Sequence, residues 1–316
     1  NLLILECRGK KNLCGLFGQN KLIYSKKVYT RKDPLATTQD FLKTCQNNLE
    51  KYKVDEVAVT ITPGNLKLMD ESLRLAMKFD VPVYPLHHTH AHISFMGNLP
   101  ALILFCNSSE TKLFLNDGKE LKIIGSSIDL SLGESMIILS RKLGINYQDI
   151  LVGKPIRQLI PVPMINHKSF DFSFRGILNK ALYYSVHSPV VSKIDPLESS
   201  FSKRSKRDMA SLGSTFQIVA IEHLVCQIRK AISWARKEYP QVKTFGFCGG
   251  VAINEKISGN LREVCSQYNF DFLVPENPLD NLDQLYTSYL QLRDSLPDLR
   301  KTDIPCLRNY PICDYL

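Results

Sequence analysis

At 316 residues and 44% hydrophobic composition, the chain is long enough to bury one large core or two medium ones. The net charge of +9 favours an acidic partner, most often RNA, although an ordinary basic protein fits the same value. No apolar run approaches the roughly 18 residues that indicate a transmembrane helix. The nine cysteines form no C-x-x-C pair and several lie in apolar stretches, so we expect buried thiols in a reducing compartment.

Taken in chain order, apolar runs and periodicity predict two successive groups of strands and helices. The first group comprises a strand at 2–7, a hairpin at 13–17 and 21–28, a helix at 37–52, a strand at 54–61, a helix at 66–79 and a strand at 81–86. The second comprises strands at 102–106, 112–115 and 121–125, helices at 132–143, 174–186 and 208–239, a strand at 242–248, a helix at 252–267, a strand at 269–274 and a helix at 280–296. Because the second group repeats the order of the first, we predict two α/β lobes with a cleft between them. The expected domains are 1–110, 111–296 with a helical insertion, and a tail at 297–316.

Four of the seven histidines fall within the stretch from His87 to His92. His88 and His92 are four residues apart, so on a helix both imidazoles would project from one face, as in a two-histidine metal site. A polar helix face that binds no metal fits the same spacing. The residue after His88 is Thr89, so the glutamate of the zinc-protease motif is missing. This favours Lewis-acid or substrate-holding chemistry over attack by a metal-bound hydroxide.

Two further stretches could carry chemistry. A buried strand that ends at Cys248 is followed by Gly249 and Gly250 and then by a helix start. Freed backbone amides and a helix N-terminus can bind a phosphate or a nucleotide there, although a plain strand-to-helix turn is the alternative. Asp280 opens the last predicted helix, either as its N-cap or as a third, hard ligand beside the histidine pair.

Together, several motifs resemble the tRNA threonylcarbamoyladenosine synthase family, and most closely its mitochondrial branch. The family's H-H-x-x-A-H corresponds to 87–92, its D-x-x-x-G-E to 129–134, its F-S-F-S-G to 172–176, its G-G-V-A-x-N to 249–254 and its T-D-N to 279–281. Arg175 stands where the family has a small residue. The likeness covers residues 1 to about 295 and leaves the tail out. Each motif alone is unspecific, but the set and its order are specific.

The resemblance implies a two-lobed α/β fold of the actin/Hsp70-like (ASKHA) class with a central cleft. It implies an acyltransferase of tRNA modification that moves a threonylcarbamoyl group from its adenylate onto N6 of adenine 37, in tRNAs reading codons that start with A. One divalent metal ion, iron or zinc, would be bound by His88, His92 and Asp280. The adenylate would contact Gly153, Gly249, Gly250 and Asn254.

For partners, the resemblance implies tRNA, threonylcarbamoyl-adenylate and a second copy of the chain. The densest basic candidate for binding RNA is the run of Lys203, Arg204, Lys206 and Arg207, for which a solvated loop is the alternative. Likeness to the mitochondrial branch and the basic charge lead us to expect a mitochondrial protein, and otherwise a cytoplasmic one.

The chain departs further from the family pattern in three motifs, and its region between the hairpin and the first helix is also short. The family's opening E-T-S-C-D-D-T is here the stretch 6–12, in which both aspartates have become lysine. Its S-G-G-H-T phosphate loop falls at 106–111 without either glycine, and its F-D-K, whose aspartate holds the ribose, is here 136–138 with isoleucine at Ile137. Loss of the glycines should hinder close approach of backbone to phosphate, and isoleucine cannot accept a hydrogen bond from a hydroxyl. Two interpretations follow: an enzyme with an altered adenylate pocket, or a weak or inactive paralogue that acts as a binding or scaffold subunit. A kinase-like ATPase fits least.

Overall fold

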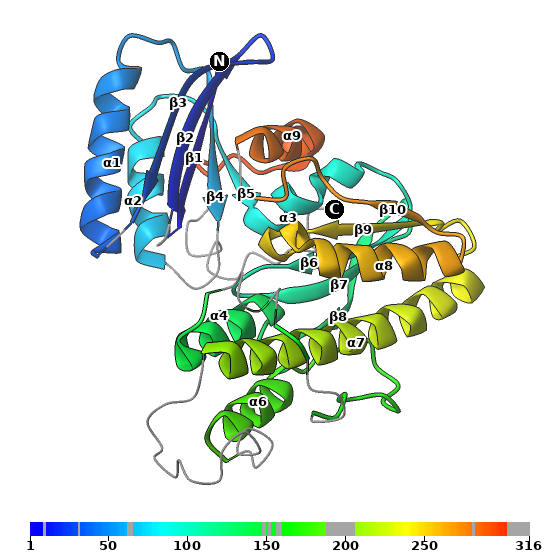
Figure 1. The fold of residues 1–316 in the computed structure, drawn as a ribbon. Coiled ribbons are helices and arrows are strands. Elements are labelled where there is room, and N and C mark those ends of the chain that lie inside the picture. Colours follow the sequence, from blue (N-terminus) through cyan, green and yellow to red (C-terminus); the bar gives the residue numbers. More distant parts are fainter. Residues whose placement is uncertain are drawn as a thin grey trace. The chain divides into compact units, whose positions relative to one another are not determined.

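The computed structural model describes residues 1–8, 11–30, 32–61, 66–146, 150, 153–155, 160–187, 206–279 and 282–301. The chain divides into two compact units, Asn1–Gly97 with Leu279–Leu316, and Asn98–Pro278. Each unit contains a five-stranded sheet, and the elements are labelled in Figure 1.

These units differ from the predicted domains 1–110, 111–296 and 297–316. The strand that follows residue 100 belongs to the second unit, because it pairs only with strands of that unit. The chain from Leu279 onward returns to the first unit, because its helix buries its apolar side on the first sheet.

The first unit has its sheet in the order β3-β2-β1-β4-β5. The strands are β1 (Leu2–Arg8), β2 (Lys11–Gly18), β3 (Lys21–Tyr29), β4 (Glu56–Ile61) and β5 (Val83–His87). The first three are antiparallel neighbours, whereas β4 and β5 run parallel to β1. The predicted hairpin between β2 and β3 is confirmed. Gln19 and Asn20 in its turn have φ values of 50° and 61°, as a two-residue turn that matches the twist of the strands requires.

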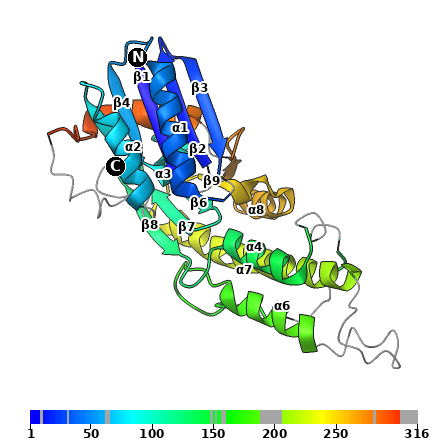
Figure 2. The same cartoon turned by 90° about the vertical axis from the view of Figure 1, so that its left-hand side faces the viewer.

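Helices cover both faces of this sheet. Helices α1 (Pro34–Leu49) and α2 (Leu66–Ala76) pack on one face, and α9 (Leu282–Leu292) packs on the other, next to α3 (His88–Ile93) (Figures 1 and 2). Leu3 and Leu5 point towards α1 and α2, while Leu2 and Ile4 belong to the cluster with α9. Because both faces are buried, β1 is a continuous apolar run rather than an alternating one. Helix α1 begins at Pro34, three positions before its predicted start, since the side chain of Asp33 caps it.

The second unit has its sheet in the order β10-β9-β6-β7-β8. The strands are β6 (Ala101–Cys106), β7 (Thr111–Asn116), β8 (Leu121–Ser126), β9 (Thr244–Cys248) and β10 (Asp271–Leu273). Three antiparallel strands are again extended by two parallel ones, so the two sheets share one topology. The predicted repetition of element order along the chain is therefore confirmed.

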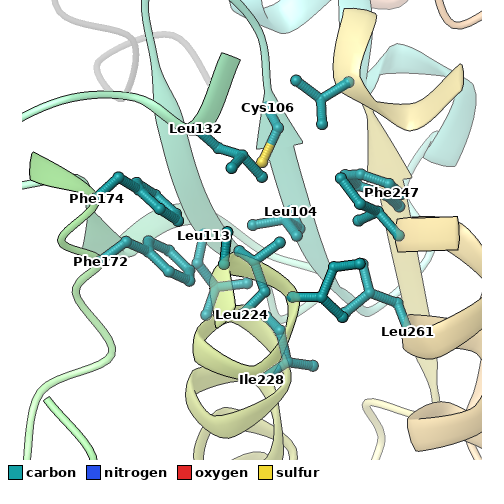
Figure 3. Close-up of a cluster of buried hydrophobic side chains, with 14 of the residues drawn as sticks. Leu104, Cys106, Leu113, Leu132, Phe172, Phe174, Leu224, Ile228, Phe247 and Leu261 are labelled. Atoms are coloured by element: carbon teal, nitrogen blue, oxygen red, sulfur yellow. The ribbon is translucent and has the colours of Figure 1, made fainter. Parts of the chain in front are cut away.

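The core of the second unit lies between its sheet and its helices. Helices α4 (Leu132–Leu143), α6 (Arg175–His187) and α7 (Lys206–Glu238) pack against one another, and α8 (Glu255–Gln267) packs on α7. Short 3-10 turns occur at Ser94–Met96, Gly250–Ile253 and Arg293–Ser295. Figure 3 shows Leu104 and Leu113 from the sheet meeting Leu224 and Ile228 of α7. The cluster also takes in the two aromatic rings that flank Ser173, so this segment is anchored from both sides.

Among the described helices, the segment Arg207–Glu238 within α7 is long and apolar enough to cross a membrane. However, 72% of its most apolar stretch is buried inside the second unit. A helix in the core of a protein is as apolar as a membrane-spanning one, because apolar side chains surround it.

Candidate functional site

The histidine cluster lies where β5 passes into α3. His87 ends the strand and caps the helix by accepting a hydrogen bond from the backbone N–H of Thr89, at 3.2 Å. His88 and His92 both lie on the inner side of α3, and their exposed fractions are 4% and 1%. The Nε2 atoms of the two rings are 3.1 Å apart, and the rings stand at 86° to one another. The predicted projection of both imidazoles from one helix face is confirmed.

Glu6, in the middle of β1, holds the first of these rings. Its Oε1 lies 2.9 Å from Nδ1 of His88, and the glutamate is 1% exposed. A ring that donates its Nδ1 proton to a carboxylate presents the lone pair of Nε2, which is how metal-binding histidines are usually oriented. The other oxygen, Oε2, is buried and has no hydrogen-bond partner among the described residues. The sequence signal for this role is a single carboxylate inside an apolar strand, and we did not predict the contact.

The spacing of the two Nε2 atoms suits a shared metal ion as well as the direct hydrogen bond that joins them. Two nitrogen ligands of a tetrahedral ion lie about 3.3 Å apart when each bond is about 2.0–2.1 Å long, close to the observed 3.1 Å between the Nε2 atoms. The predicted third ligand, Asp280, lies outside the described residues. Among the described residues no three metal-binding side chains gather at one point, so the assignment of His88, His92 and Asp280 as ligands stays a prediction.

His90 has a different role. Its Nδ1 lies 2.7 Å from Oγ of Ser288 on α9, and burial lowers the pKa of His90 to about 4. The neutral ring thus ties α3 to α9. The cluster therefore divides into a facing pair and two histidines with structural contacts.

In the second unit, the diglycine turn after β9 requires its first glycine for structural reasons. Gly249 has φ = 87°, and a Cβ there would lie 2.3 Å from the carbonyl oxygen of Cys106 at the end of β6. Asn254 is buried, and its Oδ1 accepts hydrogen bonds from the backbone N–H groups of Lys256 and Ile257, at 3.1 and 3.2 Å, as the N-cap of α8. The contacts to adenylate predicted for Gly249, Gly250 and Asn254 stay predictions.

The turn after β6, where the family's phosphate loop was expected, is closed by its own side chain. Oδ1 of Asn107 accepts hydrogen bonds from the backbone N–H groups of Ser109 and Glu110, both at 2.7 Å, and from Oγ of Ser109 at 3.0 Å. A Cβ on Gly133 would lie 2.3 Å from the carbonyl oxygen of Asn107, so the first turn of α4 packs directly on this turn. Amides that could hold a phosphate are thus engaged inside the turn.

The F-S-F segment is held by a polar network. Oγ of Ser173 donates to Oδ2 of Asp129 at 2.6 Å, and the backbone N–H of Phe174 donates to Oδ1 at 3.0 Å. Burial opposes ionisation of Asp129, but these bonds and one from the backbone of Leu130 lower its pKa overall. Both residues belong to motifs of the family resemblance, and the structure gives each a role in anchoring this segment to the start of α4.

His223 on α7 completes the network. Its Nε2 accepts a hydrogen bond from the backbone N–H of Ser173 at 3.0 Å, while its Nδ1 lies 3.1 Å from the carbonyl oxygen of Pro163 and donates to it. The bond from Ser173 requires the neutral ring, because a protonated Nε2 cannot accept, whereas the bond to Pro163 forms in either charge state. Burial lowers the pKa of His223 to about 4, against the opposing effect of the Pro163 carbonyl.

We expect this histidine to make the protein less stable in acid. Its pKa in the unfolded chain is about 6.5, above the folded value, so its contribution is complete above about pH 6.5 and is lost as the pH falls towards 4. The loss is roughly 3 kcal/mol, at about 1.4 kcal/mol per pH unit. Urea unfolding between pH 7 and pH 4.5 should show a smaller loss of stability for His223→Gln than for the wild type. Identical pH dependence in both proteins would contradict the role of the ring.

The other residues that we predicted from the sequence are Gly153, for adenylate binding, and four basic residues, for RNA binding. A Cβ on Gly153 would lie 2.1 Å from the carbonyl oxygen of Ala210, so this glycine permits close approach to α7. Of the predicted RNA-binding residues, Lys203 and Arg204 lie outside the described residues, whereas Lys206 and Arg207 begin α7, with Arg207 exposed.

The fold defines the class of protein. HypF from T. kodakarensis has a TM-score of 0.53 to this chain at 14% identity, covering 92% of this chain and 48% of that one. At this identity the likeness shows the fold alone, and it confirms the predicted actin/Hsp70-like class of two α/β units.

The chain belongs to the tRNA N6-adenosine threonylcarbamoyltransferase (TsaD) family, whose sequence model matches residues 36–281. This confirms the predicted family. A tRNA N6-adenosine threonylcarbamoyltransferase of Brucella anthropi is 27% identical over 72% of this chain, and a probable mitochondrial one of Arabidopsis thaliana is 26% identical over 72%. A Staphylococcus carnosus relative of the same description is 26% identical over 77% of this chain. The matches span 64%, 51% and 70% of the lengths of these relatives.

Proposed function

We propose that this chain is a divergent tRNA N6-adenosine threonylcarbamoyltransferase that depends on a metal ion. The observation that carries the proposal is the pair of buried imidazoles whose Nε2 atoms face one another at 3.1 Å. Membership of the TsaD family supports the reaction class, and the basic charge of +9 supports tRNA as the substrate.

In this proposal the metal ligands are His88, His92 and Asp280. A divalent ion bound there would act as a Lewis acid on the carbonyl of the threonylcarbamoyl group. Glu6 fixes the orientation of His88, so the imidazole needs no rearrangement when the ion binds. The absence of a glutamate directly after His88 fits a site that holds and polarises a substrate without generating hydroxide.

The transfer itself joins two substrates. The N6 nitrogen of adenine forms a bond to the carbamoyl carbon, while the bond from that carbon to the phosphate oxygen breaks and AMP leaves with the electron pair. N6 gives up one proton. The chain's contribution is to hold both groups in reach and to stabilise charge on the carbonyl oxygen, which are the two main sources of rate enhancement for such a step.

One observation favours a second candidate, a weak or inactive paralogue that serves as a binding or scaffold subunit. Asn107 engages the amides of Ser109 and Glu110 in the turn where the family binds phosphate. An adenylate would therefore need to be bound by other groups, for which the turn at Gly249 is our candidate. An active enzyme remains our first proposal because both histidines of the facing pair are present and Glu6 contacts one of them.

The test supplies the purified, metal-loaded chain with threonylcarbamoyl-adenylate and an unmodified tRNA transcript. We expect the modified adenosine to appear in the nucleoside digest, measured by mass spectrometry. A tRNA that is bound but not modified would favour the scaffold subunit and contradict the enzyme. Because a relative from Arabidopsis is described as mitochondrial, we also propose a mitochondrial location, which tagging the protein in cells would test.

A further inference from the structure

One face of helix α6 is basic and aromatic. The helix contains no aspartate or glutamate. Among the described side chains of α6, the exposed residues are Arg175, Gly176, Asn179, Lys180, Tyr183 and Val186. Tyr183 is 52% exposed, so part of its ring is open to solvent. Arg175, Asn179, Tyr183 and Val186 are three or four positions apart, so they lie along one side of the helix, and Lys180 borders this side.

The two cations of this face are available for an anion. Neither Arg175 nor Lys180 forms an ion pair with any residue that the structure describes. The ammonium of Lys180 lies 5.2 Å from the ring centre of Tyr183 and 5.0 Å from that of Tyr184. The two rings stand edge to face with centres 5.7 Å apart. Contact with the rings positions the lysine without neutralising its charge.

The exposed face of α6 is held rigid because the opposite face of the helix is packed in the core. Ile177, Leu178 and Ala181 are buried in the core of the second unit, where α6 packs on α4 and α7 (Figure 2). Side chains on a firmly packed helix lose little freedom on binding, so more of the contact energy is available for affinity.

We propose that the exposed face of α6 binds an unpaired segment of RNA, with Arg175 and Lys180 contacting phosphates and Tyr183 stacking on a base. Proteins bind single-stranded RNA through this combination of backbone cations and aromatic rings. Because the helix carries two cations and no carboxylate, its charge complements a nucleic acid backbone. The inference rests on the proposed function for the identity of the RNA, namely tRNA, whose loops expose unpaired bases.

The experiment measures binding of a fluorescein-labelled tRNA transcript to the full chain by anisotropy at several salt concentrations. The double variant Arg175→Ala with Lys180→Ala should weaken binding and reduce the salt slope by about 1.5, since each lost phosphate contact removes about 0.7–0.9. The matched control is Lys237→Ala with Lys243→Ala, which removes two exposed lysines and the same charge from elsewhere in this unit and should change the slope much less. Tyr183→Ala should weaken binding about tenfold, whereas Tyr183→Phe, which keeps the ring, should bind almost as wild type.

Equal effects of the two double variants, or wild-type binding by Tyr183→Ala, would overturn the proposal. The binding assay and the nucleoside assay together distinguish failure of this inference from failure of the proposed enzyme. If the chain binds tRNA through α6 but produces no modified nucleoside, the enzyme proposal fails and this inference stands. If the α6 variants bind and modify tRNA as wild type does, this inference fails and the enzyme stands. Circular dichroism of each variant checks that the helix is retained.

Discussion

His88→Ala is expected to abolish both metal binding and tRNA modification. The substitution leaves His92 as the one imidazole of the facing pair and leaves the buried carboxylate of Glu6 without its partner. One histidine ligand fewer in a site of three protein ligands removes most of its affinity for a divalent ion. Metal analysis of the purified variant should find no bound ion, and the nucleoside assay should find no product above background. The control is His167→Ala, an exposed histidine of the second unit, which should retain both.

A graded variant separates the ligand from its support. Glu6→Gln keeps both imidazoles but removes the charge that fixes the tautomer of His88, so metal affinity should fall by roughly 10–100-fold without being lost. Competition against a chelating dye measures this directly. Full metal content and activity in His88→Ala would refute the assignment, and unchanged affinity in Glu6→Gln would show that the carboxylate does not orient the ring.

Gly249→Ala is expected to destabilise the second unit by roughly 2–4 kcal/mol. The added methyl group would lie 2.3 Å from the carbonyl oxygen of Cys106, a backbone atom that cannot swing aside, and the residue would have to hold φ = 87°. The end of β9 would have to separate from the end of β6, with which it pairs. Urea unfolding of the wild type and the variant measures the change in the free energy of unfolding.

A second glycine, in α8, provides a control in which the same substitution should stabilise the protein. Gly259 lies inside α8, and a Cβ there would meet nothing within 4 Å. Gly259→Ala should therefore stabilise the protein by roughly 0.5–1 kcal/mol through helix propensity. If Gly249→Ala were as stable as wild type, the close approach to Cys106 would not constrain this turn. If its stability fell but tRNA modification in the folded fraction persisted, the turn would be structural rather than part of an adenylate pocket.

Local patterns in the sequence determined the elements and the pairing of two histidines. Strands buried on both faces read as apolar runs, as in β1, and the four-residue spacing of His88 and His92 placed both rings on one helix face. These features depend on periods of two to four residues, so a short window of sequence contains them. The order of elements was likewise sufficient to predict two α/β units of one topology.

Only the tertiary structure decided which residues support those elements. Glu6 reaches His88 across 82 positions of sequence because β1 and β5 lie in one sheet, and no local period indicates that contact. The same holds for Gly249 against Cys106, and for the return of the chain to the first unit after residue 278, which misled the predicted domain boundaries. His90 shows the limit within a single motif: it has the same chemistry as its neighbours, but its position on the helix turns it to Ser288. These contacts join residues that are far apart in the sequence. They form only when the whole fold packs those segments together, so no short stretch of sequence predicts them.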